Sequence, residues 1–466
     1  MPNNLLILKC HYSAIIRLLC HRKIKFMSMR KIIPFLIALF AIPAIMNAQV
    51  TTGNISGNVK DDKGAPLAGA SVKIVNTENG ATKFSQTDKN GRFLFPNLDP
   101  GGPYTITVTF VGLTIPEKTN VILQLGTTEN VDFTAKSSDA VLKEVVVSAQ
   151  TARTVKTGTS TNFNNRVINL LPNINRSITN IASLSPQGGA GNTFAGRDGR
   201  YNNIQIDGSS FNNNFGLSSN PLPGGAVQPI SLEAIDEISV NVSPFDVRQA
   251  NFTGAGINAT TKKGTNKFRG SVYGSFRNEN LLGRKAVGQK VPTVTESTSK
   301  TIGAFVGGPI IKNKLFFFLN AEKIDFDVPG IVWKARRGAA TSDPNESRTQ
   351  ATDLDAVSNY LKTTFGYETG PYENLGNFFT KNKKILGRLD WIISNKHSAS
   401  FRYSYSKTDD DQLLNGTSAP NPRSSSNRWS TNSMSYENSN YANTNVLSSY
   451  AFEFKSNFTT RLSNQF

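Results

Sequence analysis

The stretch NFTGAGINATTKKGTNKFRGSVYGSFRN, residues 251–278, changes character in its middle. Its first half, up to Thr265, is rich in small residues and is interrupted by glycine. From Phe268 the chain alternates, and only Tyr273 departs from the pattern. One face carries Phe268, Gly270, Val272, Gly274 and Phe276, and the other carries Arg269, Ser271, Ser275 and Arg277. Alternation with a period of two predicts a strand with one apolar and one polar face, which is typical of β-barrel strands that separate lipid from water.

Similar alternation recurs through the rest of the carboxy-terminal half. It predicts strands at residues 301–307, 315–325, 385–394, 398–406 and 446–455. Turns are predicted at Gly308-Pro309 and at residues 395–397, and the polar segments 327–382 and 408–444 are predicted to be long extracellular loops. Residues 267–466 are therefore interpreted as the first strands of an antiparallel transmembrane barrel. About six or seven strands cannot close a large plugged barrel of ~22 strands, and an open edge is not viable in lipid, so we expect an amino-terminal fragment of a longer protein.

The first 48 residues contain seven Lys and Arg but no Asp or Glu. Met29-Arg30-Lys31 precedes an apolar run over residues 32–45, and small residues follow it. This order predicts a secretory signal peptide cleaved between Ala48 and Gln49, with Met27 or Met29 as the true start. A buried core helix is the alternative interpretation. The run is too short to span a bilayer comfortably.

Composition excludes several classes of protein. Both cysteines, Cys10 and Cys20, precede the predicted cleavage, so neither disulfides nor a cysteine metal site is expected in the mature chain. The formal net charge is +18, but Lys and Arg are scattered without a dense cluster, so nucleic acid is not an expected partner. After the leader no apolar run is long enough for a transmembrane helix, and a membrane protein without such helices must be a barrel.

Residues 49–136 contain short, evenly spaced strand patterns that predict a β-sandwich. The stretches are GNISGNVKDDKGAPLAGASVKIVN, TDKNGRFLFPNL and YTITVTFVGL, and Asn90-Gly91 is a hairpin signal. This segment resembles the carboxypeptidase-regulatory-like domain, an immunoglobulin-like sandwich. A metallocarboxypeptidase needs His and Glu zinc ligands. Because His11 and His21 fall in the leader and His397 stands alone, no catalytic residues, metal site or cofactor are expected.

Residues 151–266 resemble the α+β plug domain of TonB-dependent outer-membrane receptors of the Oar-like subgroup. The matching stretches are INLLPNINRSITNIASLSP, FAGRDGRYNNIQIDGSSFNNNFGL, QPISLEAIDEISVNVSPFDVRQANFTGAGINATTKKGTN and, further on, VGGPIIKNKLFFFLN. The residue pattern predicts a short helix around residues 170–181, a brief helix capped by Ser231, and a strand that ends in an Asp207-Gly208 turn. For Arg197 and Arg200 two interpretations stay open, namely contact with acidic residues of the barrel wall or a solvated turn.

A linker, residues 137–150, separates the two predicted domains, and it contains a β-branched triplet. β-Branched residues favour an extended conformation, which suits strand addition to the sheet edge of a partner. The resemblance implies that this segment is the TonB box, the part that TonB grips from the periplasm. A last sandwich strand or a plain linker are the alternatives. The segment comprises Glu144, Val145, Val146, Val147 and Ser148.

The resemblance implies a mainly β receptor in the outer membrane, with its amino-terminal domain and TonB segment in the periplasm. Its partners would be TonB of the inner-membrane energy-transducing complex, outer-membrane lipid and an extracellular substrate that the sequence does not name. Energy from TonB would drive uptake, and no covalent chemistry is expected. The alternative function is a non-transporting adhesin or surface scaffold that keeps the same barrel and plug.

Overall fold

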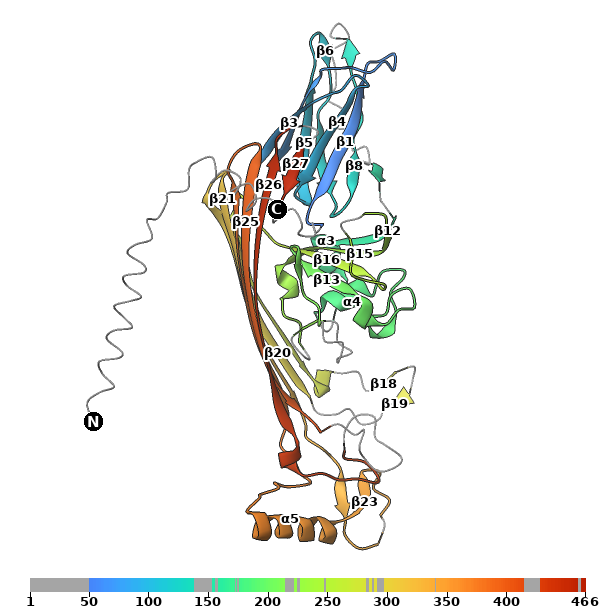
Figure 1. Ribbon diagram of the computed structural model, residues 1–466, viewed down its shortest axis with the longest axis vertical. Coiled ribbons are helices and arrows are strands. Elements are labelled where there is room, and N and C mark those ends of the chain that lie inside the picture. The colour runs from blue at the N-terminus through green and yellow to red at the C-terminus, as the bar shows by residue number, and fades with distance from the viewer. Residues whose placement is uncertain are drawn as a thin grey trace, which may run out of the picture. The chain divides into compact units, whose positions relative to one another are not determined.

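The structure is a computed structural model, and Figure 1 gives the arrangement of its elements. It describes residues 50–137, 153–155, 158–171, 173, 176–213, 222–223, 227–246, 249–281, 285–286, 289–290, 297–339, 341–414, 428–459 and 462–466. The elements below all belong to one compact unit, Gln49–Phe466. The predicted cleavage site between Ala48 and Gln49 and the segment 144–148 lie outside the described residues.

Two sheets form the amino-terminal part, which we call the sandwich. The first sheet has the order β3-β2-β5-β7 and contains β2 (Ser71–Asn76), β3 (Thr82–Gln86), β5 (Gly101–Thr109) and β7 (Lys118–Leu123). The second contains β1 (Gly53–Lys60), β4 (Arg92–Leu98), β8 (Thr128–Asn130) and β9 (Phe133–Thr134). A separate small pair joins β6 (Leu113–Thr114) to β10 (Lys136–Ser137). Alternate residues of both sheets meet in one apolar core that includes Ile55, Val72, Phe93 and Ile106, as the period-two pattern requires.

The middle of the chain, which we call the α/β unit, is built on a sheet of order β12-β15-β16-β13-β14. Its strands are β12 (Gly158–Asn164), β13 (Asn203–Ile206), β14 (Ser209–Ser210), β15 (Ile235–Pro244) and β16 (Gly256–Thr261). Its helices are α3 (Asn165–Leu170), α4 (Ile178–Ala182), and the 3₁₀ turns η3 (Ala190–Asn192), η4 (Gly199–Tyr201) and η5 (Leu232–Ala234). The brief helix capped by Ser231 is confirmed, since the Ser231 hydroxyl accepts from the Glu233 N–H. The single helix expected around residues 170–181 is wrong, because α3 ends at Leu170 and α4 begins only at Ile178.

The carboxy-terminal half forms one antiparallel sheet, which we call the wall, of order β17-β20-β21-β24-β25-β26-β27. Its strands are β17 (Arg269–Asn278), β20 (Thr298–Ile311), β21 (Leu315–Val328), β24 (Phe378–Ile392), β25 (His397–Gln412), β26 (Tyr441–Asn457) and β27 (Ser463–Gln465). Most of these strands are longer than the sequence pattern predicted. Two turn predictions need correction: Gly308-Pro309 lies inside β20, and His397 begins β25. The pairing of β17 with β20 begins at Gly307, so proline at position 309 removes no N–H that β17 needs.

Burial in the wall is the reverse of that in a water-soluble sheet. Along β24 the apolar Ile385 and Trp391 are each 52% exposed, whereas Lys384 and Arg388 on the other face are each 5% exposed. In β25 Arg402 is only 2% exposed, while the neighbouring Phe401 is 42% exposed. A polar inner face and an apolar outer face are what a barrel in lipid requires. Among the described residues, no helix has the length and apolarity to cross a membrane.

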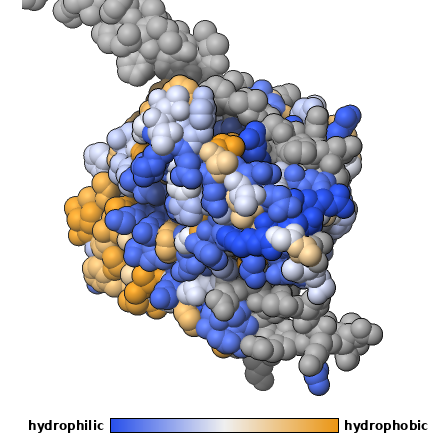
Figure 2. Space-filling model, turned by 90° about the horizontal axis from the view of Figure 1, so that it is seen from below, coloured by the Kyte–Doolittle hydropathy of each residue, from blue (hydrophilic) through white to orange (hydrophobic). Residues whose placement is uncertain are grey.

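Successive wall strands are joined by short turns at one end and by long connections at the other. The long connections contain helix α5 (Ala351–Phe365), the 3₁₀ turns η6 (Glu279–Leu281) and η8 (Glu437–Ser439), and the short pairs β18 (Lys285–Ala286) with β19 (Gln289–Lys290) and β22 (Lys334–Arg336) with β23 (Glu346–Gln350). Helix α5 was not predicted. It is held by tertiary packing, because Leu354 lies in a small core with Met434 and Tyr436 from the other loop. Seen from this end, the surface is mainly hydrophilic and hydrophobic atoms gather along one side (Figure 2).

Candidate functional site at the turn after β13

Asp207 and Gly208 form the turn that ends β13, as the sequence predicted. Both have positive φ, 44° at Asp207 and 79° at Gly208, which is the geometry that favours an Asp-Gly pair between two strands. The backbone N–H of Asp207 donates to Ala259 O at 2.9 Å, so the turn is fixed against the end of β16. The strand and its turn therefore present the Asp207 carboxylate at the edge of the α/β unit.

The Asp207 carboxylate is surrounded by donors. Thr261 donates from its N–H at 2.9 Å and from its hydroxyl at 2.6 Å. The guanidinium groups of Arg388 and Arg402 approach it to 3.0 and 3.4 Å. Burial by itself would raise the pKa of Asp207, but the two arginines and the Thr261 hydrogen bonds outweigh burial and lower that pKa below its ordinary value. The contribution of Asp207 to stability is thus present above pH 3.8 and is lost only as the pH falls through its lowered pKa.

The two arginines come from neighbouring wall strands and pair directly across them, Arg388 on β24 with Arg402 on β25. Arg402 also donates to Ile206 O at 2.8 Å and to the Ser209 hydroxyl at 3.0 Å, so its guanidinium follows the backbone of the turn. Arg388 forms a second ion pair with Asp390 at 3.0 Å. Removal of one partner from a buried ion pair leaves an uncompensated charge and costs about 3–5 kcal/mol. We call Asp207, Arg388 and Arg402 the turn–wall contact.

A second polar contact joins the α/β unit to the wall. Glu322 of β21 forms an ion pair with Lys384 at 2.8 Å, and both side chains are almost fully buried. Its other oxygen accepts from the Ser231 hydroxyl at 2.7 Å and from the Tyr273 hydroxyl at 2.9 Å. Ser231 also caps η5. The α/β unit is thus held to the wall by hydrogen bonds and ion pairs at two separate places.

Two of the predicted site residues, Arg197 and Arg200, lie away from the turn–wall contact in exposed turns. Arg200 pairs with Asp198 at 3.5 Å within its own turn, and the side chains of both are about half exposed. Arg197 is also exposed, and its backbone bonds with Phe194. Both interpretations of this pair, contact with acidic residues of the barrel wall and a solvated turn, therefore stay open. The turn–wall contact has the reverse of the predicted arrangement, because its acid, Asp207, lies on the α/β unit and its two arginines lie on the wall.

Sequence reasoning missed Arg388, Arg402, Glu322 and Lys384 as functional residues. A signal was present, because each lies at an inward position of an alternating strand whose other face is apolar. A charged residue at such a position faces the interior of a barrel, where it needs a partner. The pattern identifies the face but does not identify that partner.

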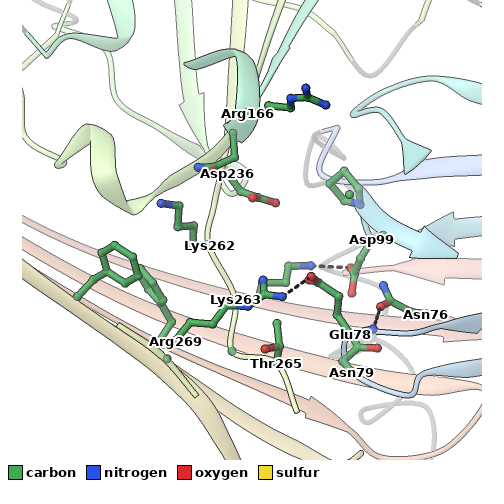
Figure 3. A pocket seen from close by; sticks show the side chains of 18 of the residues that line it. Asn76, Glu78, Asn79, Asp99, Arg166, Asp236, Lys262, Lys263, Thr265 and Arg269 are labelled. Atoms are coloured by element: carbon green, nitrogen blue, oxygen red, sulfur yellow. Dashed lines mark hydrogen bonds and ion pairs between the residues drawn. The ribbon is translucent and has the colours of Figure 1, made fainter. Parts of the chain in front are cut away.

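A seam joins the sandwich to the other two parts. Asp99 of the sandwich forms ion pairs with Lys263 at 2.9 Å and with Lys455 of β26. Glu78 pairs with Arg269 at 2.7 Å, and its carbonyl accepts from the Asn266 N–H at 2.8 Å. In Figure 3, Lys263 and Arg269 extend toward these two carboxylates across a cavity of about 470 Å³.

Glu237 lies at a buried part of this seam. Its Oε1 accepts from the Leu125 N–H of the sandwich and from the Asn162 side-chain amide of β12, both at 2.9 Å. Burial raises the pKa of Glu237 to about 7, the carboxyls of Asp236 and Glu129 act in the same direction, and the two hydrogen bonds act against them. The pKa of Asp207 is lowered and that of Glu237 is raised, so the contribution of Asp207 to stability is lost as the pH falls and that of Glu237 is lost as the pH rises.

We expect the stability of the protein to fall with rising pH because of Glu237. The pKa of Glu237 is raised in the folded state. Its contribution to the free energy of unfolding is therefore full below its ordinary pKa of 4.5, and this contribution is lost as the pH rises through about 7. Between about pH 6 and about pH 8 the loss should be roughly 1 kcal/mol of unfolding free energy. Glu237→Gln keeps an acceptor and cannot ionise, so it should flatten this slope in thermal unfolding of the full-length protein. An unchanged slope in the variant would contradict the assignment.

Known proteins resemble the chain in three separate comparisons. Residues 54–136 match the carboxypeptidase regulatory-like domain family, and residues 260–466 match the outer membrane beta barrel domain family. The chain is 26% identical over 363 residues to the TonB-dependent transporter Oar of Myxococcus xanthus, which covers 72% of this chain and 32% of that protein. It therefore spans about a third of the length of this curated relative.

Solved structures also resemble it. The outer membrane transporter YddB from Escherichia coli is 13% identical with a TM-score of 0.41, and the match covers 64% of this chain and 37% of that one. The siderophore receptor PirA from Acinetobacter baumannii is 17% identical with a TM-score of 0.38, and the match covers 64% of this chain and 38% of that one.

These findings define the class of protein first. The chain is a mainly β protein of the outer membrane that carries an amino-terminal carboxypeptidase regulatory-like domain and an outer-membrane β-barrel domain. More narrowly, it is a homologue of the TonB-dependent transporter Oar. The matched relatives named above are transporters and receptors. Among the residues that the structure describes, no group of His, Cys, Asp and Glu is arranged to hold a metal ion.

Proposed function

We propose that the chain forms part of an outer-membrane transporter that imports a substrate with energy delivered by TonB. In this proposal the α/β unit is the plug, with boundaries near residues 151–266, and the wall is one side of the barrel. Residues 49–136 form the sandwich, and residues 137–150 link it to the plug. Substrate would bind between the plug and the long loops.

The turn–wall contact is the observation that carries this proposal. The contact consists of charges and hydrogen bonds, with Arg402 on the Ile206 carbonyl and Arg388 on the Asp207 carboxylate. Polar groups that face a water-accessible interior can exchange these partners for water, whereas an apolar interface would expose hydrophobic surface when it opened. A plug held in this way is firm at rest and can still be displaced when work is done on it.

The topology supports an orientation. Bacterial outer-membrane barrels have short periplasmic turns and longer extracellular loops. The short turns include residues 312–314, where Asn313 bonds with Asn266 near the seam to the sandwich. The sandwich and the segment 144–148 would therefore face the periplasm. TonB would bind Glu144, Val145, Val146, Val147 and Ser148 by strand addition.

Binding of TonB tests this proposal directly. We expect the periplasmic domain of TonB to bind the full-length receptor purified from outer membranes. A peptide with the sequence of residues 143–149 should compete, and a scrambled peptide of the same composition should not. If the receptor fails to bind TonB, and if deletion of TonB leaves all receptor-dependent phenotypes intact, the proposal is wrong. The adhesin or scaffold function would then account better for the same architecture.

A further inference from the structure

We propose that the sandwich has a function of its own, in that it clamps the segment between the TonB segment and the plug at rest. The clamp would have to release residues 153–155 and Asn162 before a pull on residues 144–148 could reach the plug sheet. This inference rests on the proposed TonB coupling, and it assigns the sandwich the role of setting how hard TonB must pull.

The first observation is a strand pairing between residues 153–155, just after the linker, and the sandwich. Strand β11 (Arg153–Val155) runs antiparallel to β8, with Arg153 opposite Asn130 and Val155 opposite Thr128. It lies at the edge of the sheet β11-β8-β1-β4. The sandwich thus holds by backbone pairing a segment that begins five residues after Ser148. A pairing of three residues provides only a few hydrogen bonds, each contributing about 0.5–1.5 kcal/mol, so it is reversible.

The second observation concerns the next strand, β12, and is independent of the first. The Asn162 side-chain amide donates to Leu125 O at 3.0 Å and to Glu237 Oε1 at 2.9 Å. Leu125 belongs to the sandwich and is 1% exposed, and its N–H donates to the same Glu237 oxygen. Asn162 therefore ties the first plug strand to a buried loop of the sandwich. Strand β12 is an edge strand whose neighbour in the plug sheet is β15.

A clamp has to be anchored to something that does not move with the plug. The sandwich is anchored to the wall, since Asp99 pairs with Lys455 and the Asn457 amide donates to Pro96 O at 3.1 Å. Thr51 adds a hydrogen bond to Glu453. Lys455, Asn457 and Glu453 all belong to β26, a strand of the wall. A load on β11 and β12 would thus pass through the sandwich to the wall.

A reversible disulfide tests the clamp. Asn130→Cys with Arg153→Cys places two thiols directly opposite each other on β8 and β11, at a spacing that cross-strand pairs share. The two natural cysteines of this chain, Cys10 and Cys20, precede the predicted cleavage, so within residues 49–466 the new pair should be alone. Oxidised full-length receptor should lose TonB-dependent uptake, and reduction should restore it. Binding of substrate at the cell surface should be the same in both forms.

A matched control locks two strands that do not need to part. Lys73→Cys with Phe84→Cys joins exposed, directly opposed positions on β2 and β3 of the sandwich. Oxidation of this pair should leave uptake unchanged. Equal uptake by the oxidised and reduced β8–β11 variant would overturn the clamp.

Hydrogen exchange separates a failure of the clamp from a failure of the proposed function. In the resting full-length receptor those amides of residues 153–155 that donate to β8 should exchange slowly, and addition of the periplasmic domain of TonB should accelerate them. Exchange at the rate of an unstructured chain without TonB would overturn the clamp, whatever the uptake result. If these amides are protected but neither the parent nor the reduced variant shows TonB-dependent uptake, the transport proposal fails instead.

Discussion

Val146→Pro should abolish energised uptake by the full-length receptor while leaving its folded plug and barrel intact. Strand addition depends on backbone N–H groups and on an extended chain. Proline removes the N–H of residue 146 and fixes φ near −65°, so the segment could no longer supply a complete ladder to the sheet edge of TonB. Binding of substrate at the cell surface should survive, because it does not involve this segment.

Val146→Thr is the matched control for this prediction. Threonine keeps the β-branch and every backbone hydrogen bond, so its effect should be much milder. Cross-linking to TonB and uptake of the identified substrate should be measured for both variants. If the proline variant cross-links and transports like the parent, residues 144–148 are only a linker, and the adhesin or scaffold function gains support.

Asp207→Ala should loosen the plug from the wall and have the largest effect on stability. Arg388 keeps its ion pair with Asp390, but Arg402 is left buried without a carboxylate, which should cost about 3–5 kcal/mol of unfolding free energy. The expected signs are a lower unfolding temperature in detergent and faster protease cleavage within residues 151–266. Asp207→Asn should be less severe, because its side-chain oxygen can still accept from Thr261.

Asp409→Ala provides the control for loss of an acidic residue from an exposed ion pair of the wall. Asp409 lies on β25 and pairs with Lys407 at 3.1 Å, but the side chains of both are more than 40% exposed. Exposed ion pairs contribute little to stability because water screens them, so this variant should behave almost like the parent. Similar losses from Asp207→Ala and Asp409→Ala would contradict a special role for the turn–wall contact.

The proposed coupling and the proposed clamp act in sequence along the chain. TonB would grip residues 144–148, β11 would leave β8, and Asn162 would then leave Leu125 and Glu237. Only after these steps would the load reach the turn–wall contact. Because the raised pKa of Glu237 weakens the seam as the pH rises through about 7, the resistance of this path should depend on pH in the same direction.

Part of the site could be predicted from local sequence alone. The Asp207-Gly208 turn follows from the preference of that pair for positive φ, and the cap at Ser231 follows from its hydroxyl before an acidic first turn. The alternation of β24 and β25 placed Arg388 and Arg402 on a polar face. These features depend on a few neighbouring residues, so a single sequence contains them.

Other features depended on contacts that the sequence does not reveal. Gly308-Pro309 has the residues of a turn, but pairing with β21 keeps it within β20. Helix α5 lies in a polar stretch without a strong apolar stripe, and it is held by Met434 and Tyr436 from a loop about 80 residues away. Where tertiary contacts outweigh local propensity, a local pattern gives the wrong element or none.

The sequence by itself determined that the protein is mainly β, that its carboxy-terminal half alternates like a barrel, and that a β-branched triplet lies between two predicted domains. Periodicity and turn chemistry act over a few residues, so they can be read directly. Only the tertiary structure decided that Asp207 meets Arg388 and Arg402. The partners lie more than 180 residues apart, and a charge pattern fixes the face on which a residue lies but not the residue that it meets across the fold.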